Sequence, residues 1–351
     1  MVRLMQLQPQ PPELHPPLDR AWHTDPGVGY LDLTPVANEA VVVVAGARLA
    51  GLNLADGNLR WSYAQTGSTL DLTASVAGPI IAHSTQNHSL ITALTWQGDV
   101  RWQIDPGIAM AGRSLTGLDG YLLARGVHLR PSVRQVCRLI NAVTGSVEAE
   151  YPHVGGKPDI VPRGILASND AGSPDETGLW LYDFTTQHAV RLHDAPHEVR
   201  IVEDALVIID ASDRDQIPPQ GDLLAFDTTR GALLWSASGG PNHALAADRH
   251  HVASVIAPQE NQLRATLHDL RSGTLHWTSE PMLGQEALPV LAADAVLLFV
   301  DGKRLMVFDR TNGNLLQNID QPSTLIFGGC LAGNGLINVF RNTVSCLKTR
   351  S

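Results

Sequence analysis

Histidine and carboxylate residues gather in one short stretch of the chain, "HAVRLHDAPHE". It contains His188, His193 and His197 beside Asp194 and Glu198. Imidazole and carboxylate groups are ligands of transition metals, so this stretch is a candidate metal site. A structural interpretation competes with it, because His188 and His193 flank a predicted strand. An odd separation of five points the two side chains to opposite faces of a strand, and we favour this interpretation.

Few other residues of the chain are of types that take part in catalysis or metal binding. His250 and His251 are expected in a turn that enters a strand, not in a metal site. The three cysteines, Cys137, Cys330 and Cys346, are few and odd in number, and although the last two could lie near each other, nothing demands a disulfide. The sequence contains no Gly-x-Ser-x-Gly, His-Glu-x-x-His or Gly-x-x-x-x-Gly-Lys motif. We therefore expect no catalytic residues and no enzymatic activity.

The elements that would position any such residue are sequence repeats. A pattern of aspartate, then glycine four residues later, then tryptophan four residues after that, recurs about every 40 to 47 residues. The glycines are Gly57, Gly98, Gly145, Gly231, Gly273 and Gly313, with Gln187 in the fourth slot. The aspartates are Asp183, Asp227, Asp269 and Asp309. The tryptophans are Trp61, Trp102, Trp235 and Trp277, and Trp22 ends a similar segment near the N-terminus.

Short apolar runs surround each marker glycine. Examples are 296–300 and 305–308 before Gly313, and 232–235 after Gly231. Short runs bounded by turn-forming residues indicate β-strands, and no window sustains a helical stripe. In this interpretation the aspartate caps a hairpin turn and the glycine adopts a positive φ. Four antiparallel strands per repeat are predicted.

The two ends of the chain carry incomplete repeats. Residues 323–329 and 335–348 predict three strands that lack a fourth, and residues 18–22 resemble an isolated fourth strand. We therefore predict an all-β, eight-bladed β-propeller whose last blade is closed by N- and C-terminal strands, with seven blades as the alternative. The predicted domains are a Pro-rich arm over residues 1–17 and a single propeller over residues 18–351.

The repeat resembles that of the PQQ-dehydrogenase-like, or quinoprotein-type, β-propellers. This superfamily also contains the bacterial outer-membrane assembly lipoprotein, and the resemblance covers nearly the whole chain. It implies that the slot tryptophans pack between neighbouring blades. Its catalytic members use a vicinal cysteine pair, a calcium shell and an aspartate base, whereas no two cysteines are adjacent here. The resemblance is thus to a non-catalytic branch, and no cofactor is expected.

Composition restricts the partners and the location. The net charge is −10 and the only lysines are Lys157, Lys303 and Lys348, so a nucleic-acid partner is not expected. No run of 18 apolar residues occurs, so no membrane insertion is expected. The first residues contain no apolar signal region and no lipidation cysteine, which together with the few cysteines favours a cytoplasmic location.

Function is expected in the parts of the chain that do not repeat. The loops between second and third strands (B–C loops) are short in some repeats but long at residues 126–134, 168–178 and 211–221. Such loops on rigid scaffolds often carry recognition. The candidate partner-binding residues in them are Arg130, Arg134, Asp170, Asp175, Glu176, Asp213, Arg214 and Asp215. The sequence favours a non-enzymatic scaffold or adaptor that binds other proteins. The alternatives are small-molecule or quinone binding in the axial funnel, and an envelope protein-assembly factor.

Overall fold

The structure is a computed structural model that describes most of the chain. The described residues are 14, 17–24, 32–36, 40–45, 48–65, 67–75, 77–85, 88–110, 114–118, 120–129, 133–152, 158–161, 163–169, 178–183, 186, 188–193, 196–202, 204–213, 220–320, 326–332, 335–340 and 343–349. They fall into two compact units. Unit 1 comprises residues 1–7 and 24–194, and unit 2 comprises residues 8–23 and 195–351.

Unit 1 contains four four-stranded antiparallel sheets, each joining strands in chain order. The first is β2 (Asp32–Val36), β3 (Ala40–Ala45), β4 (Arg48–Asn53) and β5 (Leu59–Ala64). The second is β6 (Ser68–Ser75), β7 (Gly78–Ser84), β8 (Ser89–Leu94) and β9 (Val100–Ile104). The third is β10 (Leu115–Leu118), β11 (Tyr121–His128), β12 (Arg134–Asn141) and β13 (Val147–Pro152). The fourth is β14 (Pro158–Val161), β15 (Gly164–Asn169), β16 (Gly178–Asp183) and β17 (Ala189–His193).

Unit 2 contains one eight-stranded and two four-stranded sheets. The large sheet comprises β18 (Pro196–Val202), β19 (Ala205–Asp213), β20 (Gln220–Asp227), β21 (Ala232–Ala247), β22 (His251–Gln259), β23 (Gln262–Asp269), β24 (Leu275–Thr278) and β25 (Met282–Leu283). The next comprises β26 (Ala287–Leu291), β27 (Ala295–Val300), β28 (Arg304–Asp309) and β29 (Leu315–Asp320). The last comprises β30 (Ile326–Ala332), β31 (Gly335–Phe340), β32 (Thr343–Thr349) and β1 (Leu18–Thr24).

Strand β21 explains why one sheet is twice the usual size. Its first part pairs with β20 through Ala232 to Ala237, and its second part pairs with β22 through Asn242 to Ala247. It is therefore the fourth strand of one repeat and the first strand of the next, without an intervening loop. Six four-stranded sheets and one double sheet correspond to the eight predicted repeats.

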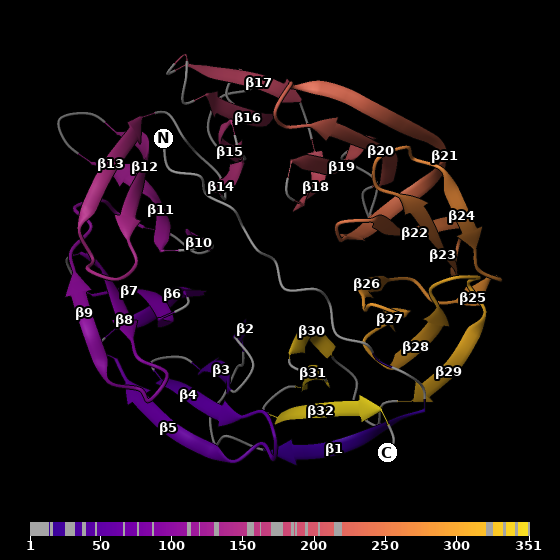
Figure 1. Ribbon diagram of the computed structural model, residues 1–351, viewed down its shortest axis with the longest axis horizontal. Helices are drawn as coiled ribbons and strands as arrows, with labels where there is room; N and C mark the ends of the chain where they lie inside the picture. The colour runs from indigo at the N-terminus through magenta and orange to yellow at the C-terminus, as the bar shows by residue number, and fades with distance from the viewer. Residues whose placement is uncertain are drawn as a thin grey trace. The chain divides into compact units, whose positions relative to one another are not determined.

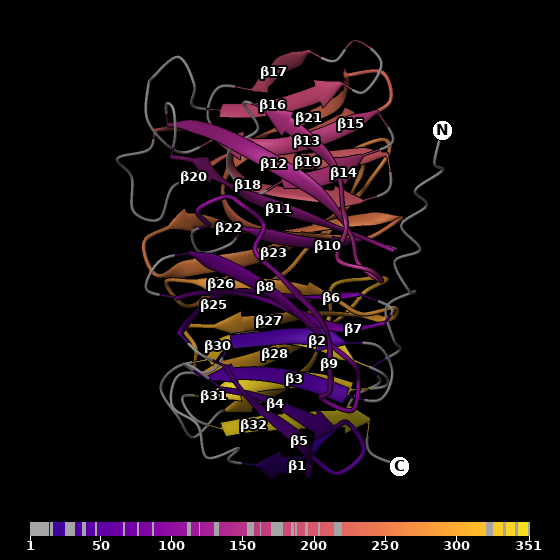
Figure 2. The same ribbon diagram turned by 90° about the vertical axis from the view of Figure 1, so that its left-hand side faces the viewer.

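The last sheet is closed by the two ends of the chain, as the sequence predicted. Its order is β1-β32-β31-β30, so the N-terminal strand lies at the outer edge beside the C-terminal strand (Figures 1 and 2). The preceding residue Leu14 is fully buried and donates its N–H to Asp294 Oδ1 at 2.7 Å. Gln317, which occupies a tryptophan slot, accepts the N–H of Leu18 at 2.7 Å and donates to its carbonyl at 3.3 Å. Described residues of the predicted N-terminal arm are thus anchored on unit 2.

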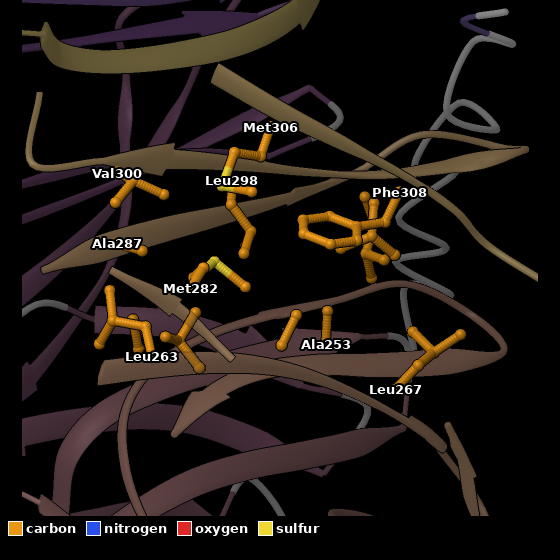
Figure 3. Packing of buried hydrophobic residues seen from close by; sticks show 14 of the residues in the cluster. Ala253, Leu263, Leu267, Met282, Ala287, Leu298, Val300, Met306 and Phe308 are labelled. Atoms are coloured by element: carbon orange, nitrogen blue, oxygen red, sulfur yellow. The ribbon is translucent and has the colours of Figure 1, made fainter. Parts of the chain in front are cut away.

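The middle strands of the sheets form the core. Every residue of β27 is buried, whereas the outer strand β29 alternates exposed and half-buried residues. In unit 2 the apolar side chains of β22 and β23 pack against those of β26, β27 and β28 in one cluster (Figure 3). Continuous burial requires β-branched and aliphatic residues on both faces, and that is the composition of the runs recognised in the sequence. No described helix is long and apolar enough to cross a membrane.

Candidate protein-binding site

The long hairpin β11–β12 carries exposed apolar residues at its tip. Leu129 is 62% exposed and Val133 is 74% exposed, the highest value for a large apolar side chain among the described residues. Soluble proteins scatter single apolar residues over their surfaces, but a pair on one loop of a rigid hairpin is typical of a contact site. The sequence pattern predicted the charged residues of this loop as binding residues, but not these two apolar residues. Their signal was an apolar residue directly before the Arg130-Pro131 pair and another two positions after it.

An ionic cluster stiffens the stem of this hairpin. Glu150 of β13 accepts hydrogen bonds from Arg138 Nε and Nη2 at 3.0 and 2.8 Å, and from His128 at 3.2 Å. Arg134, a predicted partner-binding residue, lies 3.4 Å from the same carboxylate. Burial alone would raise the pKa of Glu150, but the hydrogen bonds from Arg138 and His128 outweigh it and lower the pKa. The stem therefore presents an excess of positive charge beside the apolar tip.

The other predicted loop residues are only partly visible. Asp213 lies at the end of β19, where its backbone pairs with Gln220 of β20. The hairpin β15–β16 closes through Asn169 and Gly178. Arg130, Asp170, Asp175, Glu176, Arg214 and Asp215 lie outside the described residues. The partner-binding role of the three loops thus stays a prediction.

The short B–C loops are tight turns with defined polar contacts. In the β27–β28 hairpin Asp301 and Gly302 both adopt positive φ, 50° and 60°. The Asp301 carboxylate accepts the N–H groups of Gln285 and Glu286 at 2.7 and 3.0 Å. The β27–β28 turn therefore holds Gln285 and Glu286, which lead into β26 of the same sheet.

The repeated aspartate turns are closed by side-chain and backbone hydrogen bonds. Asp269 Oδ1 accepts the N–H groups of Arg271 and Ser272 at 3.0 and 2.7 Å, and the Gly273 N–H donates to the Asp269 carbonyl at 3.0 Å. The hydrogen bonds from Ser272 lower the pKa of the Asp269 carboxyl. Equivalent turns form at Asp227 and Asp309, and each marker glycine has a positive φ of 66° to 90°. The aspartates are occupied by their own turns.

Four tryptophans of the repeat pattern have described side chains and are followed by a repeat that contains the marker glycine. Each of the four packs on that glycine. A Cβ added to Gly313 would lie 2.7 Å from Trp277, and the indole N–H of Trp277 donates to the Arg310 carbonyl at 2.8 Å. Trp61, Trp102 and Trp235 make the same pair of contacts with Gly98, Gly145 and Gly273 and with the carbonyls of Trp96, Ala142 and Leu270. Every one of these pairs lies within one unit. These tryptophans join neighbouring repeats, while the side chain of Trp22 lies outside the described residues.

The histidine stretch contains only fragments of the proposed ligand set. His188 precedes β17 and His193 ends it, while Asp194 and the side chains of His197 and Glu198 lie outside the described residues. A β-bulge between Leu179 and Trp180 interrupts the alternation on which the opposite-face expectation rested. Among the described residues no group of three or more His, Cys, Asp or Glu side chains is arranged to hold a metal ion.

A second histidine group lies in unit 2. Asp248 accepts the N–H groups of His250 and His251 at 3.0 and 2.9 Å, forming the turn that enters β22. The guanidinium of Arg310 contacts both Asp248 and the Nδ1 atom of His251. Burial, reinforced by Arg310, lowers the pKa of His251. These contacts join the turn before β22 to Arg310, which directly follows β28 of the next sheet.

The cysteines are not placed for a disulfide. Cys330 in β30 and Cys346 in β32 both pair with Ile337 of the strand between them, so they lie two strand spacings, about 9.5 Å, apart. A disulfide requires Cα atoms within about 7 Å. Burial raises the pKa of the Cys346 thiol to about 11 and also raises the pKa of the Cys137 thiol. Both described thiols are therefore unreactive at neutral pH.

Comparisons with known proteins identify the fold. Residues 179–325 match the family described as outer membrane protein assembly factor BamB. BamB from Moraxella catarrhalis superposes with a TM-score of 0.63 at 13% identity, over 95% of this chain and 98% of that one. The computationally designed Ika8 protein superposes with a TM-score of 0.68 at 11% identity, over 94% of this chain and 99% of that one. A search of curated proteins finds no significant match.

The fold is therefore an all-β propeller similar to that of BamB, and the resemblance predicted from the repeat is confirmed. The number of eight blades stays a prediction, which the six four-stranded sheets and one double sheet match in number.

Proposed function

We propose that this chain is a non-enzymatic propeller that binds another protein through its long B–C loops. The observation that carries the proposal is the β11–β12 hairpin, where Leu129 and Val133 are held in solvent by a stem fastened through Glu150. A rigid stem lowers the entropy lost on binding, and a desolvated apolar pair supplies binding energy. The partner is a protein, with the loops at 168–178 and 211–221 as further contact regions.

The likeness to BamB supports a narrower form of the proposal. The matching family is described as an assembly factor for outer membrane proteins. By this likeness the chain acts as an envelope assembly factor that holds a partner protein and catalyses no reaction. A cytoplasmic adaptor remains the competing prediction from the sequence. Fractionation of the native cell separates the two, since recovery with the envelope supports the assembly factor and recovery with the cytosol supports the adaptor.

The loop assignment is tested by partner capture with surface variants. The native partner is first identified by cross-linking and mass spectrometry, and its affinity is then measured with purified proteins. We expect Val133→Ser and Leu129→Ser to weaken binding about tenfold or more, because apolar anchors dominate interfaces. The combined reversal Asp213→Lys with Asp215→Lys tests the third loop in the same assay.

Leu59→Ser is the matched control, because Leu59 is also a solvent-exposed leucine but lies on the outer strand β5. It should bind as the unaltered chain does. Equal affinities for the control and the loop variants would overturn the loop assignment.

A further inference from the structure

The connection from β24 to β26 in unit 2 is an ordered platform. Ser279 donates its N–H to the Ala265 carbonyl at 2.9 Å and accepts the Ala265 N–H at 3.0 Å. Farther along, the Gly284 N–H donates to the Asn261 carbonyl at 3.1 Å. The guanidinium of Arg304 donates to the Leu283 carbonyl. Almost every turn of this connection is therefore fastened to a neighbouring strand.

Leu283 stands out from this fastened backbone. Its side chain is 71% exposed, although a leucine on an ordered two-residue strand is ordinarily buried. Its neighbour Met282 is buried in the cluster between β23 and β27, where Figure 3 shows it beside Leu263. A Cβ added to Gly284 would lie 2.6 Å from Val300, so the chain is pressed against β27 directly after Leu283. The exposure of Leu283 is thus fixed by the backbone.

Strand register places Leu283 and Arg264 on the same face of the sheet. Leu283 pairs with Gln262, and Met282 pairs with Leu263. Directly paired residues share a face and alternate residues along a strand share a face. Gln262, Arg264 and Leu283 therefore project together, away from the cluster that receives Leu263 and Met282. Ile256, which pairs with Arg264, extends the same face.

The Nε atom of Arg264 lacks an acceptor within the described part of the chain. This atom is buried and no hydrogen-bond partner lies within reach. A buried charged donor without an acceptor lowers stability and demands an explanation. Asp248 and Asp204 each receive a different arginine, so the described part of unit 2 does provide arginine partners elsewhere.

The corresponding arginine of the next repeat shows what is missing. Arg304 stands five residues before the turn aspartate Asp309, as Arg264 stands five residues before Asp269. Arg304 donates to a carbonyl of the connection that precedes its sheet. Before the sheet of Arg264 that connection is the continuous strand β21, and no acceptor among its described residues reaches Arg264 Nε. The Nε atom of Arg264 is therefore left without an acceptor among the described residues.

We propose that Ile256, Gln262, Arg264 and Leu283 form a docking surface for an acidic, extended segment of another protein. A carboxylate of the segment completes the hydrogen bonding of Arg264, and an apolar side chain packs on Leu283. Leu283 and Arg264 are diagonal neighbours, about 7 to 8 Å apart at Cα, which an extended peptide spans in two residues. The recognised pattern is therefore an acidic residue and an apolar residue separated by one position. This surface rests on the proposed protein-binding function, and its four residues lie outside the three long loops, although Gly221 at the end of the third loop shares a strand-pairing row with Ile256 and Arg264.

A peptide selection on the full chain tests the proposal. Random 12-residue peptides displayed on phage are selected against the immobilised protein, and enriched sequences are synthesised for titration by fluorescence anisotropy. We expect an Asp or Glu two positions from Leu, Ile or Phe. Arg264→Gln should weaken binding about tenfold or more, and Leu283→Ser several-fold, because each removes one of the two anchors. Replacing the acidic residue of the peptide by its amide should weaken binding to the unaltered protein by the same factor. The same replacement should not weaken binding to the Arg264→Gln variant any further.

Two control variants separate this contact from general attraction. Lys303→Gln removes an exposed cation from the next hairpin, and Leu275→Ser removes an exposed leucine from β24. Neither should change the affinity more than twofold. Peptides without an acid, affinities unchanged by Arg264→Gln, or no enrichment at all would overturn the proposal.

The same variants distinguish this surface from the loop assignment. Val133→Ser should leave the peptide affinity unchanged. A failed selection together with loss of native-partner binding in Val133→Ser would reject this surface and retain the loops. If peptide binding depends on Arg264 and Val133→Ser has no effect on the affinity for the native partner, this surface is retained and the loop assignment is rejected.

Discussion

The two ends of the sheet formed by β22, β23 and β24 satisfy their polar groups differently. At one end the Asp269 turn matches every nearby backbone donor with an acceptor, and the same turn recurs at Asp227 and Asp309. At the other end Arg264 Nε has no acceptor among the described residues and Leu283 is exposed. The repeated end contributes to stability, whereas the unrepeated end offers unsatisfied groups to a partner. Function in a repeat protein is thus sought where a sheet departs from its own pattern.

Removing a tryptophan from the repeated end has the largest expected effect. In Trp277→Ala the buried indole, its hydrogen bond to the Arg310 carbonyl and its packing on Gly313 are lost together. Large aromatic truncations in a core cost about 3–5 kcal/mol. Chemical denaturation followed by fluorescence should show a decrease of this size. A decrease below about 1 kcal/mol would mean that the tryptophans do not hold neighbouring repeats together.

Adding one methyl group to a marker glycine should have the next largest effect. Gly313→Ala forces a Cβ against Trp277 and also strains a residue at φ 74°. We expect a loss of about 2–3 kcal/mol, from overpacking together with backbone strain.

Gly120→Ala separates the two causes in the same denaturation assay. Gly120 has φ 73° but no atom lies within 4 Å of an added Cβ. This control should lose only the backbone contribution, about 1 kcal/mol. Equal losses at both glycines would show that packing on the tryptophan contributes nothing.

Acidification should weaken the repeated end in two steps. Burial lowers the pKa of His251 and of His268, so the native state resists protonation while the unfolded chain takes up protons. Stability is therefore full above pH 6.5 and falls as the pH drops below it. The lowered pKa values of Asp227, Asp269 and Asp309 predict a further loss below about pH 3.8.

Thermal melting from pH 8 to pH 3 checks this order. The step near neutrality should shrink in His251→Gln, whose amide can still accept from Arg310, and should persist in a variant of the exposed His188. His251 also faces Asp248, His250 and His276, and these neighbours stay unchanged in the test. A melting temperature independent of pH between 8 and 5 would contradict the prediction.

The unrepeated end should tolerate change with the smallest effect on stability. Leu283→Ser should alter the free energy of unfolding by less than about 0.5 kcal/mol, because its side chain is exposed. Arg264→Gln should not lower this free energy, because it removes a buried donor that has no acceptor among the described residues. Denaturation midpoints measure this directly. A loss above about 1.5 kcal/mol in either variant would place these residues with the structural end of the sheet.

Much of the fold was predictable because it repeats. The spacing of Gly57, Gly231 and their relatives gave the strand order, and the matching fragments at residues 18–22 and 335–348 predicted how the last sheet closes. The contact of each tryptophan with the next glycine was not predictable from spacing within one repeat. A trace of it exists, because the repeat with Ala149 in the tryptophan slot is followed by Gln187 in place of glycine.

The candidate binding residues were harder to predict. Arg264 and Arg304 have the same spacing to their turn aspartates, but the connections that precede their sheets differ, and no local pattern distinguishes a continuous strand such as β21 from two strands with a loop. Strand β25 has two residues, too short for a periodic signal. The backbone around Leu283 is held by the hydrogen bonds from Arg304 to the Leu283 carbonyl and from the Gly284 N–H to Asn261, and both partners are distant in sequence.

The anchoring of Leu18 by Gln317 also sets a timetable for synthesis. The two residues are 299 positions apart, so a ribosome adding about 5–20 residues per second takes about 15–60 s to supply the second after the first. Throughout that interval Leu18 lacks its acceptor, and for most of it Leu14 lacks its own acceptor, Asp294. Strand β1 is therefore made before the other described strands but is among the last of them to be placed, and a nascent chain must keep β1 from pairing elsewhere until β32 emerges.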